Sequence, residues 1–242
     1  MNSPAKSAAV ALGLLVGFAA AASRADGSSA PAPAPLTSVS AASAPPPSSA
    51  SPAAPAGAST SSAATTTATN AARIVERARA EVVAQVSYDP SYRRLSYPGG
   101  DLDARFGVCT DVVVRALRSV GIDLQRRVHE DILAAPSAYP RVRADANIDH
   151  RRVGPLKTWF ERHAKRLPKG FEGDARASWR AGDVVAWAFR PCPACSPDHV
   201  GVVSDRVGPR GLPLVIHNIG PTPSEDDQLD AWTVLGHFRV GE

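Results

Sequence analysis

Residues 107–121 read Gly-Val-Cys-Thr-Asp-Val-Val-Val-Arg-Ala-Leu-Arg-Ser-Val-Gly, and they predict an amphipathic helix with a cysteine in its first turn. Apolar residues recur with helical spacing at positions 112, 113, 116, 117 and 120. Gly107 allows a tight turn before the helix, and Gly121 stands where a helix ends. Thr110 and Asp111 place a hydroxyl and a carboxylate near the free N–H groups of the first turn.

Cys109 is a candidate nucleophile because of its position at the start of this helix. The thiolate is the nucleophilic form of cysteine, and a free thiol titrates near ~8.5. A helix N-terminus and a nearby imidazolium both favour the anion. The competing interpretation is a structural cysteine in the core, because free cysteine is among the most buried residue types. A histidine near Cys109 would favour the nucleophile.

The first seventy residues differ in composition from the rest of the chain. Residues 1–25 carry a lysine, an apolar run and then small residues, the pattern of a secretory signal peptide. An uncleaved segment that anchors the protein is the alternative, and it is the only membrane contact that we expect. Residues 26–70 are almost entirely Ala, Pro, Ser and Thr, which predicts a disordered linker. We therefore expect an exported protein, periplasmic or secreted, with one folded domain over residues 71–242.

The charge balance narrows the class of partner. The chain has 27 Lys and Arg against 23 Asp and Glu, a formal net charge of +4. A mildly basic exported domain favours an anionic polymer such as the cell wall. Export and the lack of a concentrated basic tract argue against a nucleic-acid partner.

Two further cysteines, Cys192 and Cys195, form a Cys-Pro-Ala-Cys motif. In an oxidising compartment this spacing predicts a local disulfide that closes a loop. Half of a zinc site and a redox-active pair are the alternatives. Cys109 is then the odd thiol of the chain.

The order of the predicted elements indicates an α+β fold. Helical spacing is found at residues 71–87, 107–121, 125–135 and 154–166. Strand patterns follow at residues 184–189, 198–204, 214–218 and 232–240. Short strands joined by turns predict an antiparallel sheet, and helices followed by strands are typical of the α+β class.

Two polar loops carry candidate substrate-binding residues. Tyr97 and Asp101 lie in the turn-rich segment that leads into the cysteine helix, and loops between rigid elements often carry binding residues. Arg151 and Arg152 lie in a second loop, and a guanidinium binds a carboxylate in a bidentate way. The alternatives are tyrosines that pack at the domain edge and an internal cluster of salt bridges.

Two histidines lie at strand ends that an antiparallel sheet brings together. His199 begins one predicted strand and His217 lies near the end of the next, and antiparallel neighbours place such ends side by side. We therefore expect Cys109 to attack, His199 to take and return the proton, and His217 to hold the tautomer of that base. Asn218 is the alternative third residue, because adjacent strand residues point to opposite faces. The backbone N–H of Cys109 is a candidate oxyanion donor.

A metal-dependent hydrolase is the alternative chemistry. His129, Glu130 and His150 carry ligand atoms, but their spacing matches no recognised metal motif. We expect neither a metal nor a cofactor in the site.

Seven motifs spread over the folded domain carry a family resemblance. They are Tyr-Pro-Gly-Gly-Asp at 97–101, Gly-Val-Cys-Thr-Asp-Val-Val at 107–113, Val-His-Glu-Asp at 128–131, Asn-Ile-Asp-His-Arg-Arg-Val at 147–153, Asp-His-Val-Gly-Val-Val at 198–203, Ile-His-Asn-Ile-Gly at 216–220 and Gly-His-Phe-Arg at 236–239. With these motifs the chain resembles the YijF-like family, an exported bacterial domain of unknown function.

That family is in turn similar to the NlpC-type cell-wall peptidases and CHAP-type amidases of the papain-like superfamily. The resemblance implies a papain-like fold, with N-terminal helices packed on a small antiparallel sheet, and hydrolysis of amide bonds in peptidoglycan peptides. It matches Cys109 to the nucleophile, His199 to the base and His217 to the third residue. The peptidases usually carry a Ser-Gly pair after the cysteine, whereas Asp111 is expected here to raise the pKa of the thiol. A non-catalytic domain that binds or scaffolds the cell wall is the alternative function.

Overall fold

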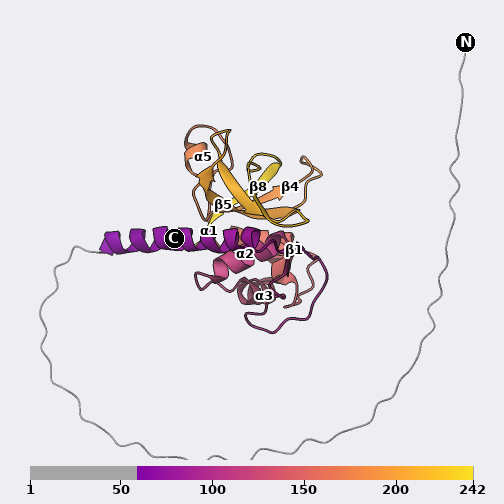
Figure 1. The fold of residues 1–242 in the computed structure, drawn as a ribbon. Helices are drawn as coiled ribbons and strands as arrows, with labels where there is room; N and C mark the ends of the chain where they lie inside the picture. Colours follow the sequence, from indigo (N-terminus) through magenta and orange to yellow (C-terminus); the bar gives the residue numbers. More distant parts are fainter. Residues whose placement is uncertain (1–58, 242) are drawn as a thin grey trace, which may run out of the picture. The chain divides into compact units, whose positions relative to one another are not determined.

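The computed structural model describes residues 59–241, and these form an α+β domain (Figure 1). The predicted signal peptide and the linker up to residue 58 lie outside the described residues. Between residues 59 and 241, no helix has both the length and the apolar character needed to cross a membrane.

The helical elements occupy mostly the first half of the described chain. They are α1 (Ser59–Val83), α2 (Cys109–Arg118), α3 (Leu124–Ala134), α4 (Val153–His163) and α5 (Gly173–Ala177), with the short 3-10 helices η1 (Pro136–Ala138) and η2 (Asp149–Arg151). Two short strands, β1 (Ser87–Tyr88) and β2 (Phe106–Gly107), pair in parallel just before α2.

The other strands form a six-stranded antiparallel sheet. They are β3 (Lys165–Arg166), β4 (Val184–Ala188), β5 (His199–Val207), β6 (Pro213–His217), β7 (Ser224–Asp226) and β8 (Thr233–Arg239), in the spatial order β3-β8-β4-β5-β6-β7. The register pairs Trp187 with His199 and Val202 with Ile216. The start of β5 and the end of β6 therefore lie at the same end of the sheet, as the sequence pattern predicted.

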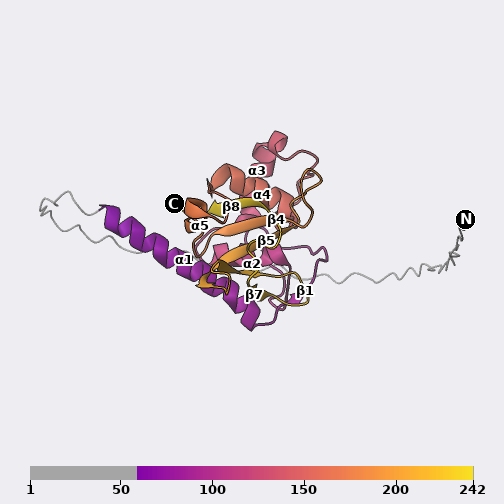
Figure 2. The same cartoon turned by 90° about the horizontal axis from the view of Figure 1, so that it is seen from above.

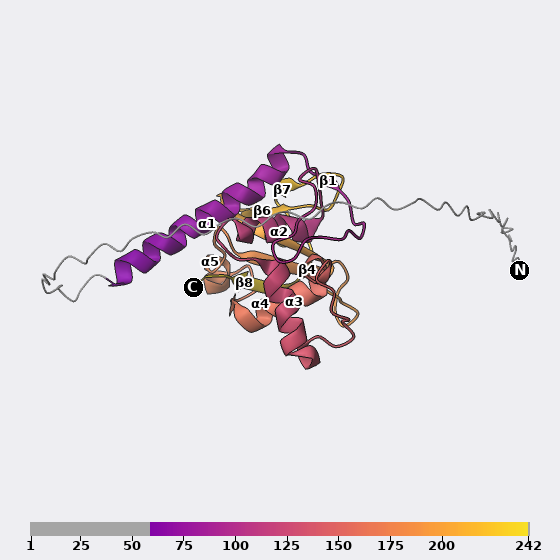
Figure 3. The same ribbon diagram turned by 90° about the horizontal axis from the view of Figure 1, so that it is seen from below.

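Helices α1 to α4 lie on one face of this sheet (Figures 1–3). The main core lies between them, where Val184, Ala186 and Val200 of the sheet pack with apolar residues of the helices. Val185 and Trp187 belong to a second buried cluster on the opposite face. This alternation follows from the period of two along a strand, and it leaves the central strands buried on both faces.

Two expected boundaries are corrected by the structure. Helix α1 begins at Ser59, although residues up to 70 were expected to be disordered linker. Pro55 and Gly57 are the last helix-breaking residues before the helix, and the Ser-, Thr- and Ala-containing residues 59–70 include neither proline nor glycine. Helix α4 ends at His163, and Lys165–Arg166 pairs with β8 as strand β3 instead of continuing the helix.

The cysteines are arranged as one disulfide and one free thiol. Cys192 and Cys195 are bonded in the loop between β4 and β5, so the local disulfide is the interpretation that the structure shows. Cys109 is free and buried. Within residues 59–241, no three His, Cys, Asp or Glu side chains are grouped so that they could hold a metal ion.

Candidate functional site

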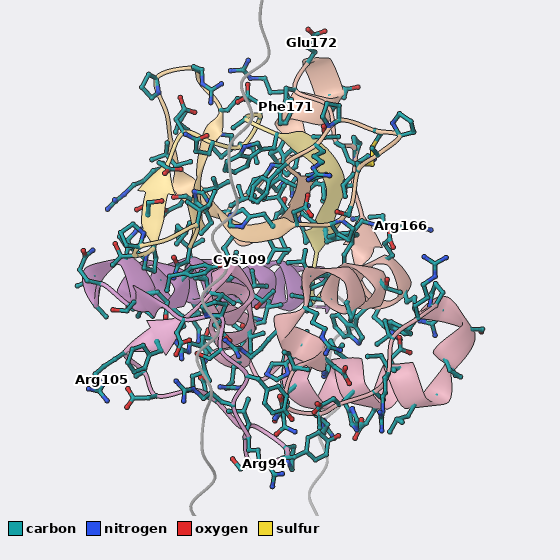
Figure 4. All side chains as sticks on the ribbon, turned by 90° about the vertical axis from the view of Figure 1, so that its right-hand side faces the viewer. Arg94, Arg105, Cys109, Arg166, Phe171 and Glu172 are labelled. Carbon is teal, nitrogen blue, oxygen red and sulfur yellow. A yellow bond between two sulfur atoms is a disulfide. The ribbon has the colours of Figure 1, made fainter. Side chains whose placement is uncertain are left out.

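Cys109 lies at the first position of α2, where the helix meets the sheet (Figure 4). The preceding Val108 is extended, and its N–H donates to Asp111 Oδ2 at 2.7 Å. This bond fixes the first turn, because the carboxylate takes up a backbone donor that the helix itself leaves free. Only 6% of Cys109 is exposed, since the residue forms part of the main core.

Burial dominates the titration of this thiol. It raises the pKa of Cys109 to about 11, while backbone N–H groups of Val200, Thr110 and Cys109 itself favour the anion. The charge of Asp111 raises the pKa further, which confirms the direction expected from the sequence. The free protein therefore holds Cys109 as a neutral thiol at neutral pH, because desolvation outweighs the helix N-terminus.

His199, His217 and Asp226 form a chain of hydrogen bonds at the end of the sheet. His199 Nε2 lies 2.7 Å from His217 Nδ1, and His217 Nε2 lies 3.0 Å from Asp226 Oδ1. The amide of Asn218 instead donates to the carbonyl of Gly107 at 3.4 Å. Of the two candidate third residues, His217 is therefore the one that is hydrogen-bonded to His199.

The carboxylate of Asp226 orders the protons along this chain of hydrogen bonds when each ring carries a single proton. Hydrogen bonds from His217 and Ser224 lower the pKa of Asp226, so its carboxylate only accepts. His217 Nε2 then carries the proton, and His217 Nδ1 accepts from His199 Nε2. The free lone pair of His199 is consequently on Nδ1, the nitrogen that a general base would use.

Aromatic rings surround His199 and keep it neutral. Trp187 and Phe189 stack on its ring with centroids at 5.5 Å, and Trp232 approaches edge-on at 5.6 Å. Burial, together with the neighbouring His217, lowers the pKa of His199 to about 3. The free protein therefore holds a neutral thiol in the main core and a neutral His199 imidazole among rings that belong to the second buried cluster.

Gly201 makes room for the histidine pair. A Cβ at this position would lie 3.2 Å from both His217 Cβ and a ring carbon of Trp187, and 3.1 Å from the carbonyl of Ile216. These contacts are tighter than ordinary van der Waals contact, so a side chain there would displace the ring that holds His199.

Arg151 and Asp101 are engaged within the protein. Arg151 Nε is 3.0 Å from Asp111 Oδ1, and its other nitrogens donate to the carbonyls of Ser91 and Asp89. Asp101 accepts from Arg115 Nη2 at 3.0 Å, and Arg115 also pairs with the buried Glu81. Arg151 thus forms the internal salt bridge that the sequence left open as its alternative, and Asp101 belongs to a second group of ion pairs.

Tyr97 and Arg152 remain on the surface, away from these ion pairs. The Tyr97 ring contacts His129 edge-on at 5.5 Å. The Arg152 side chain is 45% exposed, and its nearest carboxylate oxygen, Asp149 Oδ1, is 3.9 Å away. Their assignment to substrate binding stays a prediction.

Sequence reasoning missed two residues of the site. Asp226 follows a turn in a short acidic run, and only the pairing of β7 with β6 brings it to His217. Tyr88 lies near the thiol, since burial and the charge of Cys109 raise the pKa of its phenol. Nothing in the spacing of the loop distinguishes Tyr88 from its neighbouring tyrosines.

The residues of the alternative metal site do not gather around a common point. His129 Nδ1 is hydrogen-bonded to Asp149 Oδ2 at 2.9 Å. His150 is buried, its Nδ1 lacks a hydrogen-bond partner, and burial lowers its pKa to about 4. Glu130 interacts with the Tyr97 hydroxyl on the outer side of α3.

Comparison with known proteins places these residues in a family. Residues 75–240 match the family described as "Domain of unknown function (DUF1287)", a range that includes Cys109, His199, His217 and Asp226. A relative from Escherichia coli strain K12, "Uncharacterized protein YijF", is 46% identical over 175 residues, which cover 71% of this chain and 82% of the relative. These matches confirm the family to which the sequence motifs pointed. The chain belongs to the DUF1287 family.

Proposed function

We propose that this protein is an exported cysteine hydrolase of amide bonds, with Cys109 as nucleophile and His199 as general base. One observation carries the proposal: the bonds from His199 to His217 and on to Asp226 leave the His199 Nδ1 lone pair free, at the start of β5, where the backbone N–H of the next residue, Val200, reaches the thiol. A lone pair on one ring nitrogen, with the other nitrogen held by a hydrogen bond, is what a general base requires. We further propose a papain-like fold and peptidoglycan peptides as substrate, because the motifs resemble the NlpC-type peptidases.

The neutral resting state defines the first chemical step. His199 Nδ1 takes the thiol proton as Cys109 Sγ bonds to the substrate carbonyl carbon, and the N–H of Cys109 stabilises the oxyanion. His199 then returns the proton to the leaving nitrogen as the C–N bond breaks, which forms a thioester. Water, deprotonated by His199, attacks the thioester, and the thiolate leaves and regains that proton. In the free protein this proton transfer is unfavourable, because the pKa of the thiol is about 11 and the pKa of His199 is about 3. Substrate binding therefore has to bring the two pKa values closer together.

Replacing the nucleophile tests the proposal. Cys109→Ala is expected to abolish the release of peptides from purified peptidoglycan, since no other free cysteine is found in residues 59–241. Chromatography of the soluble products measures the release. The exposed His163→Gln variant should retain full activity and serves as the control. Undiminished release by Cys109→Ala would disprove the mechanism.

Asp226 is expected to act as a positioning residue through the tautomers of both rings. An amide at this position can donate to His217 Nε2, which reverses both hydrogen bonds and puts a proton on His199 Nδ1. Asp226→Asn should therefore lower kcat by about two to three orders of magnitude, with KM little changed. The adjacent Asp227→Asn, whose carboxylate pairs with Arg210, is the matched control. Equal losses in the two variants would show that only local structure is affected.

The buried thiol supports a second candidate, a domain that binds the cell wall without cleaving it. A pKa of about 11 and 6% exposure suit a structural cysteine as well as a nucleophile. The triple variant Cys109→Ala, His199→Gln, His217→Gln separates the two functions in a sedimentation assay with purified sacculi. Retained binding, together with no peptide release by the unmodified protein, would favour the second candidate.

A further inference from the structure

A polar cavity of about 680 Å³ opens between the loop at residues 92–95, the loop at residues 143–147 and helix α3. Its lining includes three arginines, Arg94, Arg143 and Arg152, and we call it the arginine pocket. We propose that the arginine pocket binds a ligand that carries several oxyanion groups, carboxylate or phosphate. Its volume is in the range of small-molecule sites.

The three guanidinium groups are left without strong partners. No described residue forms a hydrogen bond or an ion pair with the side chain of Arg94 or Arg143. Arg152 reaches Asp149 only at 3.9 Å. Like charges gathered around one cavity repel one another, and an anion that enters it relieves this repulsion. Planar guanidinium groups bind carboxylate or phosphate oxygens in pairs.

Two carboxylates near the pocket act on Arg152, and among the described residues neither of them pairs with the other two arginines of the pocket. Asp145 accepts from the backbone N–H and the side-chain amide of Asn147 and from the Tyr92 hydroxyl, at 2.8–3.1 Å. Burial raises the pKa of Asp145, but hydrogen bonds from Asn147 and Tyr92 and the charge of Arg152 together hold it below its ordinary value. The buried Asp149 accepts from the backbone of Asp145 and from His129. Both carboxylates are thus used to hold the walls of the pocket.

Hydrogen bonds between the loops form the pocket before any ligand arrives. Asn147 Oδ1 accepts from the N–H of Leu95 at 2.8 Å, which joins the two loops. The buried Gln125 of α3 donates to the carbonyls of Ser96 and Ala146 and accepts from the N–H of Gly100. A site whose walls are already ordered loses little entropy when it binds.

The arginine pocket is separate from the thiol. Figure 4 shows Arg94 at the far end of the helical layer from Cys109. Arg152, which the sequence predicts to bind a carboxylate, is one of the arginines that line this pocket. Because binding to the pocket is measured without turnover, the inference stands or falls independently of the proposed hydrolysis.

Titration calorimetry of the full chain tests the pocket with two probes, citrate for carboxylates and inorganic pyrophosphate for phosphates. We expect one probe to bind with a defined stoichiometry, and Arg143→Gln to weaken that binding about tenfold, equal to roughly 1.4 kcal/mol. Arg94→Gln should act in the same direction. Neither substitution removes a hydrogen bond or an ion pair within the described residues, so both variants should fold.

Arg166→Gln is the matched control, because Arg166 is exposed on β3 and lies away from Arg94 in Figure 4. It removes the same charge from outside the pocket and should change the affinity less than twofold, a small effect for a distant surface charge (roughly 0.4 kcal/mol). Tighter binding of citrate would identify a carboxylate ligand, and tighter binding of pyrophosphate a phosphate ligand. Failure of both probes to bind at millimolar concentration, or equal weakening by Arg166→Gln and Arg143→Gln, would overturn the proposal.

Discussion

Replacing Arg151 with methionine is expected to lower the free energy of unfolding by about 3–5 kcal/mol. The Arg151 and Asp111 side chains are each only 3% exposed, and they pair at 3.0 Å beside the start of α2. Methionine fills much of the same volume but leaves the Asp111 carboxylate buried without its counter-charge. It also removes the donors to the carbonyls of Asp89 and Ser91, so the loop before β2 loses its attachment. Urea unfolding measures the loss.

Two further variants isolate the buried charge in this prediction. Arg152→Met changes the neighbouring arginine, which is 45% exposed, and should cost no more than about 0.5 kcal/mol. The double variant Arg151→Met, Asp111→Asn should be more stable than Arg151→Met alone, because it removes the unpaired carboxylate. Equal stability of Arg151→Met and Arg152→Met would contradict the structural role of the buried pair.

The stability of the protein is expected to fall as the pH decreases from 6.5, with His199 as one main cause. Its pKa is about 3 in the folded protein against 6.5 in the unfolded chain, mainly because of burial. Between pH 6.5 and pH 3 this histidine is protonated in the unfolded chain but stays neutral in the folded protein. Stability is therefore fully present above pH 6.5, and it is lost at about 1.4 kcal/mol per pH unit toward pH 3. His150, with its pKa lowered to about 4, adds a similar slope.

The His199→Gln variant tests this linkage by the slope of stability against pH. Urea unfolding between pH 6.5 and about 5.5 covers a window in which carboxylates still contribute little. In His199→Gln, about one proton fewer should be taken up on unfolding, so the slope of the unfolding free energy against pH should be smaller, whatever the effect on absolute stability. An unchanged slope in His199→Gln would mean that the folded protein already accepts the proton there.

Some features were predictable because they depend on neighbours in the sequence. The apolar spacing after Cys109 identified α2. The strand-like segments between turns identified β4, β5, β6 and β8 to within a few residues. From those strands the proximity of His199 and His217 followed, since antiparallel pairing places their ends together. The family motifs were also readable directly, and the match over residues 75–240 confirms them.

The start of α1 shows where local reasoning was incomplete. Residues 59–70 were assigned to the linker by their Ala, Ser and Thr content, yet they continue the helix that packs on the sheet. Composition indicates only whether a segment has enough apolar surface to fold by itself. A helix that is nucleated by packed residues downstream extends through such a segment until a breaker stops it.

The sequence by itself determined the class of fold, the helix that carries Cys109, the two strand ends that carry histidines, and the family. Only the tertiary structure decided that Asp226 completes the hydrogen-bonded chain, that Arg151 and Asp101 are held in internal ion pairs, and that the thiol and His199 are both neutral. The physical reason is the separation along the chain between the residues that interact. Helix and strand patterns arise between neighbouring residues, whereas burial, ion pairing and pKa depend on groups that the fold brings together from distant parts of the chain.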